Sequence, residues 1–551
     1  MPDDTFGQLC QRYLEQRWYH DPVGASGMGI HTHDSEWPDL SQEGLQARER
    51  STSTMLHDLN DLPIGSLKTA DDRIDYQLIR LELEARLRDS QLRLWERAPY
   101  QYPEIAGRGL HSLLERDYAP LPERVRALVR RMQGIPALLD VGKANTSEEA
   151  PPLWVDIAIA SSLGLDKFLQ GAVPEMSEQV PEKALALQEA AIAASEANAE
   201  FRQFLEELAP RARGSYAVGK TYFDALLRDK FLLDLDSDQL HEFGLWSIEN
   251  SLEKLTEVAS RIVAGKDWAE VMDLVKEDHC QPDELLTAYQ KEIERCRDFV
   301  QEKELVTIPP GERCDMAPTP VFLLSRFPMG HFSMVRPFEQ ANQGYWFMTP
   351  VDTEQPWEKQ KQHLRDNNYH FMRAITLHEC YPGHHLQGYY SKLHRSDIRK
   401  SSFDTIYGEG WGLYTEEMMY EAGFLNDPRD RLVQLRNELW RGVRIVIDTG
   451  LHTANMGFEE ATQLLMDKVR FERLWAEGEI RRYTTSPTQP SSYLVGRNVL
   501  LNLRNDYQQE RCDAFRLKEF HDRLLSLGSI PLALVRQELL GEQTQAPRLR
   551  Y

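Results

Sequence analysis

The stretch HECYPGHHLQ, residues 378–387, contains residue types that bind metal ions. When a helix carries His-Glu and then a second His three residues after the Glu, the two imidazoles lie one turn apart and bind Zn²⁺, while the Glu polarises the bound water. Here Pro382 takes the place of the second His. Because Pro382 cannot extend the hydrogen-bond ladder and Gly383 permits unusual backbone angles, we expect the helix to bulge or break at this point.

Two histidines follow the expected break, and either is a candidate second ligand beside His378. A lengthened turn would bring His384 to face His378, whereas a straight helix would favour His385, seven positions further on. The sequence favours His384 and leaves His385 as the alternative. Glu379 is the expected general base of such a site.

A third protein ligand is needed, with one position left open for water. The segment YGEGWGLYTEEMMYEAG, residues 407–423, offers Glu409 among three glycines, and small neighbours let one helix approach another closely. Glu416 lies seven residues further on and shares that face, so we expect it to support the site. The alternative for Glu409 is a solvent-facing helix acid, which is the usual place for a single Glu.

The segment 430–455 is predicted to be a helix that is buried on most sides, because its polar stripe is narrow. Asp448 is a candidate to hold the far ring nitrogen of a ligating His, and His452 and one arginine are candidates for substrate contact. A buried ion-pair network is the alternative role for the arginines. The stripe consists of Asn437, Arg441, Arg444, Asp448 and His452.

Further along the chain, Tyr493 and Arg497 lie one turn apart at the start of an apolar helix that follows a Pro- and Ser-rich loop. A Tyr hydroxyl or an Arg opposite a metal ion can stabilise an oxyanion, so both are catalytic candidates. A packed Tyr at a helix start is the alternative. Arg441, Arg444 and Arg497 could also pair with a substrate carboxylate, which would favour exopeptidase or dipeptidase action.

The elements that must position these residues are mostly helices. Residues 357–380 are predicted to form one helix with His378 and Glu379 at its end. Just upstream, 319–350 is rich in β-branched and aromatic residues and predicts two or three short antiparallel strands. The strand at 343–349, with Tyr345 and Phe347, is a candidate to hold an extended peptide, and a plain structural hairpin is the alternative. Other helices are predicted at 71–94, 182–209, 238–263 and 283–304, and loops at 19–40, 145–152, 305–318 and 484–491.

Composition limits the class of protein. The chain has 551 residues, 27% of them charged, and a net charge of -23. An acidic balance argues against nucleic acid or an anionic membrane as the main partner, since a phosphate-binding surface needs a basic excess. Six scattered cysteines, no apolar leader and no run of 18 apolar residues predict a cytoplasmic protein with reduced thiols and no membrane span.

Several of these motifs, taken in order, resemble one family. HECYPGHHLQ, YGEGWGLYTEEM, LRNELWRGVRIVIDTGLH, TQPSSYLVGR and FHDRLLSLGSIPLALV, with TADDRIDYQLIRLELE near the N-terminus, are similar to the bacterial proteins grouped as domain of unknown function 885. The resemblance covers nearly the whole chain. It implies a zinc metallopeptidase-like protein that is a remote, mostly helical relative of the gluzincin peptidases, with a deep cleft between two helical halves.

The resemblance also implies roles for particular residues. His378, His384 and Glu409 would be the metal ligands and Glu379 the general base, and the GHHLQ segment, similar to the GHALQ-like end of the helical peptidase motif, supports His384 over His385. We therefore expect a mainly α fold over 1–551 with two interleaved lobes, a small β element at 319–350 and a metal-site core at 357–504.

These observations predict a Zn²⁺-dependent hydrolase that cleaves peptide or related amide bonds in small substrates. Two alternatives use the same residues. Two His and a carboxylate also suit Fe(II), which would make the protein a non-haem iron enzyme. A non-catalytic binding or scaffold protein that retains a metal site is the other.

Overall fold

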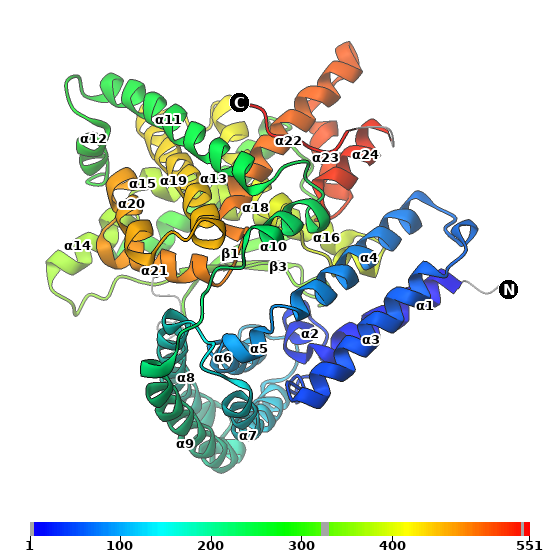
Figure 1. The fold of residues 1–551 in the computed structure, drawn as a ribbon. Coiled ribbons are helices and arrows are strands. Elements are labelled where there is room, and N and C mark those ends of the chain that lie inside the picture. Colours follow the sequence, from blue (N-terminus) through cyan, green and yellow to red (C-terminus); the bar gives the residue numbers. More distant parts are fainter. Residues whose placement is uncertain (1–4, 321–329, 542–544) are drawn as a thin grey trace.

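The computed structural model describes residues 5–320, 330–541 and 545–551, and these form a mainly α-helical protein with one small sheet (Figure 1). The N-terminal helices are α1 (Thr5–His20), α2 (Pro22–Met28), α3 (Gln42–Asn60), α4 (Ala70–Ser90), α5 (Leu94–Arg97), α6 (Gln101–Leu114), α7 (Leu121–Asn145), α8 (Pro152–Gln179) and α9 (Ala184–Leu208). Next come α10 (Lys220–Ala225), α11 (Ser237–Ile262), α12 (Trp268–Val275) and α13 (Leu285–Glu302). After the strands follow α14 (Trp357–Asp366), α15 (Tyr369–Glu379), α16 (His384–Leu393), α17 (Asp397–Lys400), α18 (Thr405–Glu421), α19 (Pro428–Thr453), α20 (Phe458–Val469), α21 (Arg473–Thr484), α22 (Gln489–Arg511), α23 (Leu517–Ser526) and α24 (Leu532–Leu540).

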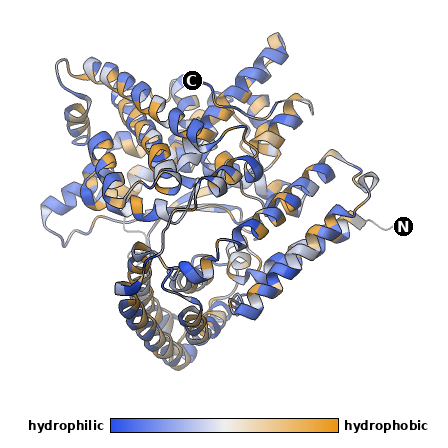
Figure 2. Ribbon diagram, in the orientation of Figure 1, coloured by the Kyte–Doolittle hydropathy of each residue, from blue (hydrophilic) through white to orange (hydrophobic). Residues whose placement is uncertain are grey.

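The long amphipathic helices lie where their hydrophobic spacing predicts them. The predicted helices at 71–94, 182–209, 238–263, 283–304 and 430–455 correspond to α4, α9, α11, α13 and α19. Local signals set their starts: the Thr69 side chain accepts a hydrogen bond from the Asp72 N–H, and Asp72 reciprocates, so a capping box begins α4. Hydrophobic and hydrophilic residues are interleaved along these helices (Figure 2), as expected for helices that bury one side.

The helix that carries His378 is shorter than predicted. Residues 357–380 form two helices, α14 and α15, and not one. The Asn368 side chain accepts hydrogen bonds from the N–H groups of His370 and Phe371, at 3.2 and 3.0 Å, and so starts a new helix at this point. An Asn side chain competes well for free backbone donors, which makes it a strong helix start inside a continuous amphipathic pattern.

The small sheet is mixed, whereas an antiparallel sheet is predicted. Its strands are β1 (Arg313–Pro318), β2 (Gly330–Ser333) and β3 (Gln343–Met348), in the order β1-β3-β2. β3 pairs in parallel with β1 and antiparallel with β2. β1 comes from the predicted loop 305–318, and 321–329 of the predicted β element lie outside the described residues. Because β3 is the central strand, the prediction that 343–349 offers a free edge to a peptide is wrong.

The buried hydrophobic residues form three clusters, and the largest includes residues of this sheet. One lies within 98–208, between α6, α7, α8 and α9. Another lies between α11, α12, α19, α20 and α21. The largest joins the N-terminal helices α1, α3 and α4 to helices from α10 to α24. In Figure 1 the sheet lies between α5–α9 below and α11, α19 and α22 above.

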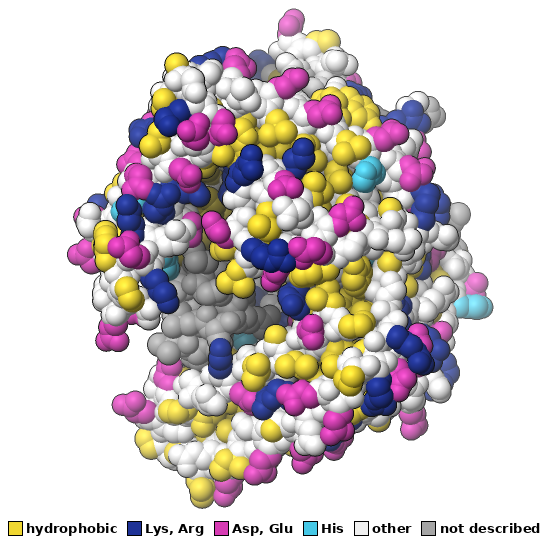
Figure 3. Space-filling model, turned by 60° about the vertical axis from the view of Figure 1, so that its left-hand side comes forward, with side chains coloured by type: hydrophobic (Ala, Val, Ile, Leu, Met, Phe, Trp, Pro, Cys, Tyr) yellow, Lys and Arg dark blue, Asp and Glu magenta, His cyan; other side chains and the backbone are white. Residues whose placement is uncertain are grey.

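Surface charge is mixed on the face that Figure 3 shows. Acidic and basic side chains alternate across this face, so the net charge of -23 is not gathered into one patch there. None of the helices in the described part of the chain is both long enough and apolar enough to cross a membrane.

Candidate metal centre

The helix is interrupted between α15 and α16, as the Pro-Gly pair predicts. α15 ends at Glu379 and α16 begins at His384. A Cβ at Gly383 would lie 1.7 Å from the carbonyl oxygen of His378, so only glycine allows the chain to pass back over the end of α15. This path brings the rings of His378 and His384 to a centroid distance of 4.9 Å.

Three predicted ligands come together at this break. One ligand atom each from His378, His384 and Glu409 lies within 4.8 Å of the other two. His384 Nε2 and Glu409 Oε2 are 3.4 Å apart. Ligand atoms on one tetrahedral zinc ion are separated by about 3.4 Å, given metal–ligand distances of about 2.1 Å. The three side chains therefore need only small movements to share an ion.

Glycines in α18 allow this approach, as predicted. A Cβ at Gly412 would lie 2.6 Å from His378 Nε2, so the helix that carries Glu409 could not pack against that ring with any larger residue. A Cβ at Gly410 would lie 2.5 Å from the backbone of Gly496 in α22. Gly412 thus leaves room for His378, and Gly410 lets α18 and α22 pack closely behind it.

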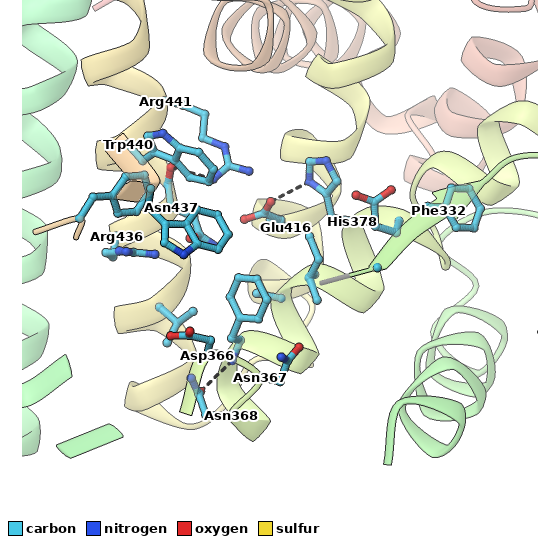
Figure 4. Close-up of a pocket in the computed structure, with 18 of the residues that line it drawn as sticks. Phe332, Asp366, Asn367, Asn368, His378, Glu416, Arg436, Asn437, Trp440 and Arg441 are labelled. Atoms are coloured by element: carbon cyan, nitrogen blue, oxygen red, sulfur yellow. Dashed lines mark hydrogen bonds and ion pairs between the residues drawn. The ribbon is translucent and has the colours of Figure 1, made fainter. Parts of the chain in front are cut away.

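Glu416 forms a hydrogen bond with Nδ1 of His378, the ring nitrogen that would not bind the metal ion. The distance from His378 Nδ1 to Glu416 Oε1 is 2.8 Å, and both side chains are buried (Figure 4). With Nδ1–H donating to a carboxylate, Nε2 keeps its lone pair for a metal ion. Asp448 is also a predicted candidate for this contact, but it lies elsewhere and accepts hydrogen bonds from the Thr488 N–H and the Ser491 hydroxyl, at 3.1 and 2.6 Å.

Charge favours an ion pair between His384 and Glu409 when no metal is bound. Burial by itself would lower the pKa of His384, but the hydrogen bond to Glu409 and the charges of Glu379 and Glu409 raise that pKa to about 9. Burial would raise the pKa of Glu409, and the His384 hydrogen bond, with the positive charges nearby, lowers it to about 2. The site therefore attracts a cation at neutral pH, either a proton on His384 or a metal ion.

His385, the alternative second ligand, points away from this cluster. Its side chain is fully buried, and its Nε2 lies 2.8 Å from Glu312 Oε2. Glu312 also accepts a hydrogen bond from Tyr381 and pairs with Arg297 at 3.3 Å. His385 therefore belongs to a buried network beside the sheet, and His384 is the histidine that faces His378.

Tyr493 lies beside the ligands, as a catalytic role would require. Its ring stacks near that of His378 at a centroid distance of 6.4 Å. Gln489 Nε2 lies 3.3 Å from the Tyr493 hydroxyl and 3.3 Å from Glu409 Oε1, so one side chain links the two. Burial raises the pKa of Tyr493, which keeps its hydroxyl protonated and able to donate a hydrogen bond.

A cavity of about 690 Å³ opens onto the cluster and is lined by all three candidate ligands and by Glu379, Glu416 and Tyr493. Figure 4 shows Arg436, Asn437, Trp440 and Arg441 along one wall, on α19, with Phe332 near the opposite wall. Trp346 and Met348 of β3 also line it. The narrow polar stripe predicted on α19 therefore faces a cavity over its first half.

Besides His385 and Asp448, four more predicted site residues lie outside this lining. Arg497 is partly buried and pairs with Glu438 through two contacts of 2.6 and 3.0 Å. His452 is fully buried, with Nε2 3.1 Å from the Tyr483 carbonyl oxygen. In β3, the Tyr345 ring lies under Arg116 and the Phe347 ring stacks on His331. Because side chains alternate along a strand, the neighbours of Tyr345 and Phe347 face the cavity instead.

Sequence reasoning missed several residues that line or support the cavity. Arg436 and Trp440 precede Arg444 by eight and four positions, so helical spacing places all three on one face of α19. In the sequence alone, however, a charged and an aromatic residue are equally typical of a solvent-exposed helix surface. Gln489 lay in a segment predicted to be a loop, whereas α22 begins there, with Pro490 tolerated in its first turn. Glu312 carried no local signal, because its partner His385 is 73 residues away.

The fold and this cluster together define a mainly helical protein with a His-His-Glu centre at the wall of a cavity. The chain belongs to the family described as "Bacterial protein of unknown function (DUF885)", whose match spans residues 22–539. This confirms the family that the sequence motifs predict. No curated protein matches the chain.

Two solved structures share the fold over almost its full length. One is described as "a putative lipoprotein of unknown function from Shewanella oneidensis", with 24% identity, a TM-score of 0.80, and coverage of 97% of this chain and 99% of that one. The other is described as "the putative lipoprotein from Colwellia psychrerythraea", with 18% identity, a TM-score of 0.83, and coverage of 97% and 98%. At these identities the likeness shows the fold alone.

Proposed function

We propose that the protein is a zinc-dependent hydrolase that cleaves peptide or related amide bonds in small or oligopeptide substrates. The observation that carries the proposal is the meeting of His378, His384 and Glu409, with ligand atoms within 4.8 Å of one another, at a cavity that Glu379 also lines. Two imidazoles and one carboxylate form a catalytic zinc set that leaves one position open. The resemblance to gluzincin peptidases supports the same assignment.

The residues have distinct tasks in this proposal. A bound zinc ion would polarise the substrate carbonyl and make water a nucleophile near neutral pH. Glu379 accepts the proton of the attacking water and passes it to the leaving amine. The protonated hydroxyl of Tyr493 donates a hydrogen bond to the developing oxyanion. Glu416 holds His378 in the tautomer that presents Nε2 to the cavity.

The cavity supports a small substrate. Its volume of about 690 Å³ lies within the range of small-molecule and peptide sites, about 300–1,000 Å³. Its walls combine aromatic rings, such as Trp440 and Phe332, with many acidic and basic side chains, a composition suited to a short peptide with charged ends.

The proposal is tested on the purified full chain, loaded with zinc and incubated with a peptide library with and without a chelator. We expect cleavage that the chelator abolishes and zinc restores. Glu379→Gln should bind zinc normally and lose about 10²–10⁴-fold in kcat, which is the usual contribution of a general acid-base. Cleavage that is indifferent to the chelator, or full activity in Glu379→Gln, would overturn the proposal.

The same protein separates the alternatives. Metal analysis after purification without added metal distinguishes a zinc centre from an iron centre, because His-His-carboxylate also suits Fe(II). Iron in place of zinc would support a non-haem iron enzyme. Zinc binding without any cleavage would support a binding or scaffold protein.

A further inference from the structure

One wall of the cavity contains guanidinium groups without a carboxylate partner. Arg441 is 6% exposed, and no Asp or Glu oxygen in the described part of the chain lies within 4.0 Å of it. Its Nη1 donates only a long bond of 3.3 Å to the Asn437 carbonyl, and its Nε has no hydrogen-bond partner among the described residues. Arg436, one turn earlier, likewise has no acidic partner within that distance in the described ranges. A buried cation in this state lacks the acceptors that would offset its lost hydration.

Other arginines with little exposure have stronger acceptors than Arg441. Arg497 is paired with Glu438, and Arg444 reaches Glu479 at 3.0 Å. Arg131 is fully buried without an acid, but its two terminal nitrogens donate to several carbonyl and hydroxyl oxygens, including those of Gly109 and Ser26. Single unpaired nitrogens also occur in these arginines, at Arg131 Nε and Arg444 Nη1. What sets Arg441 apart is that it has neither an acidic partner nor more than one long hydrogen bond among the described residues.

The Arg441 side chain is also held in place for a ligand. Its Cζ lies 4.5 Å from the Trp440 ring centroid and 5.4 Å from that of Tyr493, so two aromatic faces fix the guanidinium plane while its edge stays available. In Figure 4 this side chain extends from α19 into the cavity, toward Glu416 and His378. The Asn437 Oδ1 beside it also lacks a hydrogen-bond partner in the described part of the chain and can accept from a substrate N–H.

Building on the proposed function, we infer that Arg441, assisted by Arg436, binds the C-terminal carboxylate of the peptide substrate, so that the protein acts as a carboxypeptidase. A planar guanidinium matches a carboxylate with two parallel hydrogen bonds. The distance sets the length of the product. The Tyr493 ring centroid lies 6.4 Å from that of His378 and 5.4 Å from Arg441 Cζ. The His378 ring and the Arg441 guanidinium are therefore at most about 12 Å apart, which leaves room for one or two substrate residues at about 3.5 Å each.

The test uses pairs of peptides that differ only in a free or an amidated C-terminus. We expect the free form to be cleaved with a kcat/KM about 10- to 100-fold above the amide, and mass spectrometry to show loss of one or two C-terminal residues. Arg441→Gln should remove this preference, because cleavage of the free form should slow about 10- to 100-fold more than cleavage of the amide. Arg436→Gln should reduce the preference for the free C-terminus by a smaller factor. This second variant provides the test if Arg441→Gln folds poorly.

Arg473→Gln is the matched control, because Arg473 is exposed, lies outside the cavity lining and pairs with Glu459 and Glu477. Arg473→Gln should cleave the free and the amidated peptide at the wild-type rates. Equal cleavage of free and amidated peptides, or an equal loss for both in Arg441→Gln, would overturn the inference while leaving the hydrolase proposal intact.

Binding provides a readout that does not depend on turnover. In zinc-loaded Glu379→Gln protein, calorimetry should show the free peptide binding about 10- to 100-fold more tightly than its amide, and adding Arg441→Gln should abolish the difference. If no peptide is cleaved by the wild type but this binding difference remains, the hydrolase proposal fails and carboxylate recognition stands. Equal binding of the two peptides would sink the inference directly.

Discussion

Glu416 contacts His378 through one hydrogen bond of 2.8 Å, and this contact should set the strength of metal binding. Glu416→Gln keeps the shape but replaces a carboxylate acceptor by a neutral amide, which makes the imidazole a weaker ligand. We expect zinc affinity to fall by about 10- to 100-fold, as measured by competition with a chromophoric chelator. Glu417→Gln, the same change one position along, removes a partner of Arg431 outside the cluster and should have no such effect. Equal affinities in the two variants would contradict this role.

The ion pair between His384 and Glu409 predicts how metal affinity depends on pH. In the metal-free protein the pKa of His384 is about 9, so below that pH a metal ion must displace a proton. Affinity should therefore rise about tenfold per pH unit from pH 6 to 8 and level off above about 9. Glu409, with a pKa of about 2, stays ionised throughout.

Competition titrations in non-chelating buffers measure this dependence, and calorimetry in buffers of different ionisation enthalpy should show close to one proton released at pH 7. Glu409→Gln removes the charge that raises the His384 pKa, so the rise should end at a lower pH. An affinity that is constant between pH 7 and 9 would contradict the assignment of His384.

Two glycines of α18 make different contacts, and the same substitution at each should have different consequences. At Gly412 a methyl group would meet the His378 ring at 2.6 Å, and a ring can rotate away. At Gly410 it would meet the backbone of α22 at 2.5 Å, and backbone cannot give way without moving a helix. Gly412→Ala should thus lose zinc affinity by at least tenfold and keep its melting temperature, because Ala also favours the helix by about 1 kcal/mol.

Gly410→Ala should instead lower the melting temperature by about 1–3 °C, because overpacking usually costs about 1–3 kcal/mol. Gly478→Ala in α21 is the control, since a methyl group there would meet nothing within 4 Å. It should be neutral or slightly stabilising. Loss of stability in Gly412→Ala equal to that in Gly410→Ala would show that α18 packing, and not the His378 contact, explains its glycines.

Elements with local signals were predictable from the sequence, and elements with distant partners were not. The Pro-Gly break, the glycine-bracketed Glu409 and the amphipathic helices all depend on neighbours within a few residues. The pairing of β1 with β3 and of Arg497 with Glu438 depends on partners about 30 and 59 residues away. The spacing of polar residues on α19 thus identified its cavity-facing side but could not say which arginine already had an acid.

The candidate metal cluster depends on the fold as a whole. Its ligands come from α15, α16 and α18, while α19, α22 and the sheet complete the cavity. The family match spans 22–539, and both solved structures share the fold over 97% of the chain, so these elements belong to a fold that extends over nearly the whole chain. An ion at the cluster would link three helices, and should stabilise the molecule against unfolding.

Zinc should raise the melting temperature of the metal-free protein by about 2 °C at a free concentration 100-fold above its Kd, and a chelator should reverse the change. Glu409→Ala should abolish the shift. A second cluster, His111, Glu115 and His331, has ligand atoms within 4.8 Å of one another and could bind zinc instead.

However, Glu115 also pairs with Arg336 at 2.7 Å, and a guanidinium beside the carboxylate opposes a dication. Glu115→Gln should therefore keep the zinc-induced shift. The reverse pattern, with the shift lost in Glu115→Gln and kept in Glu409→Ala, would move the metal from α15, α16 and α18 to the junction of α6 with the sheet.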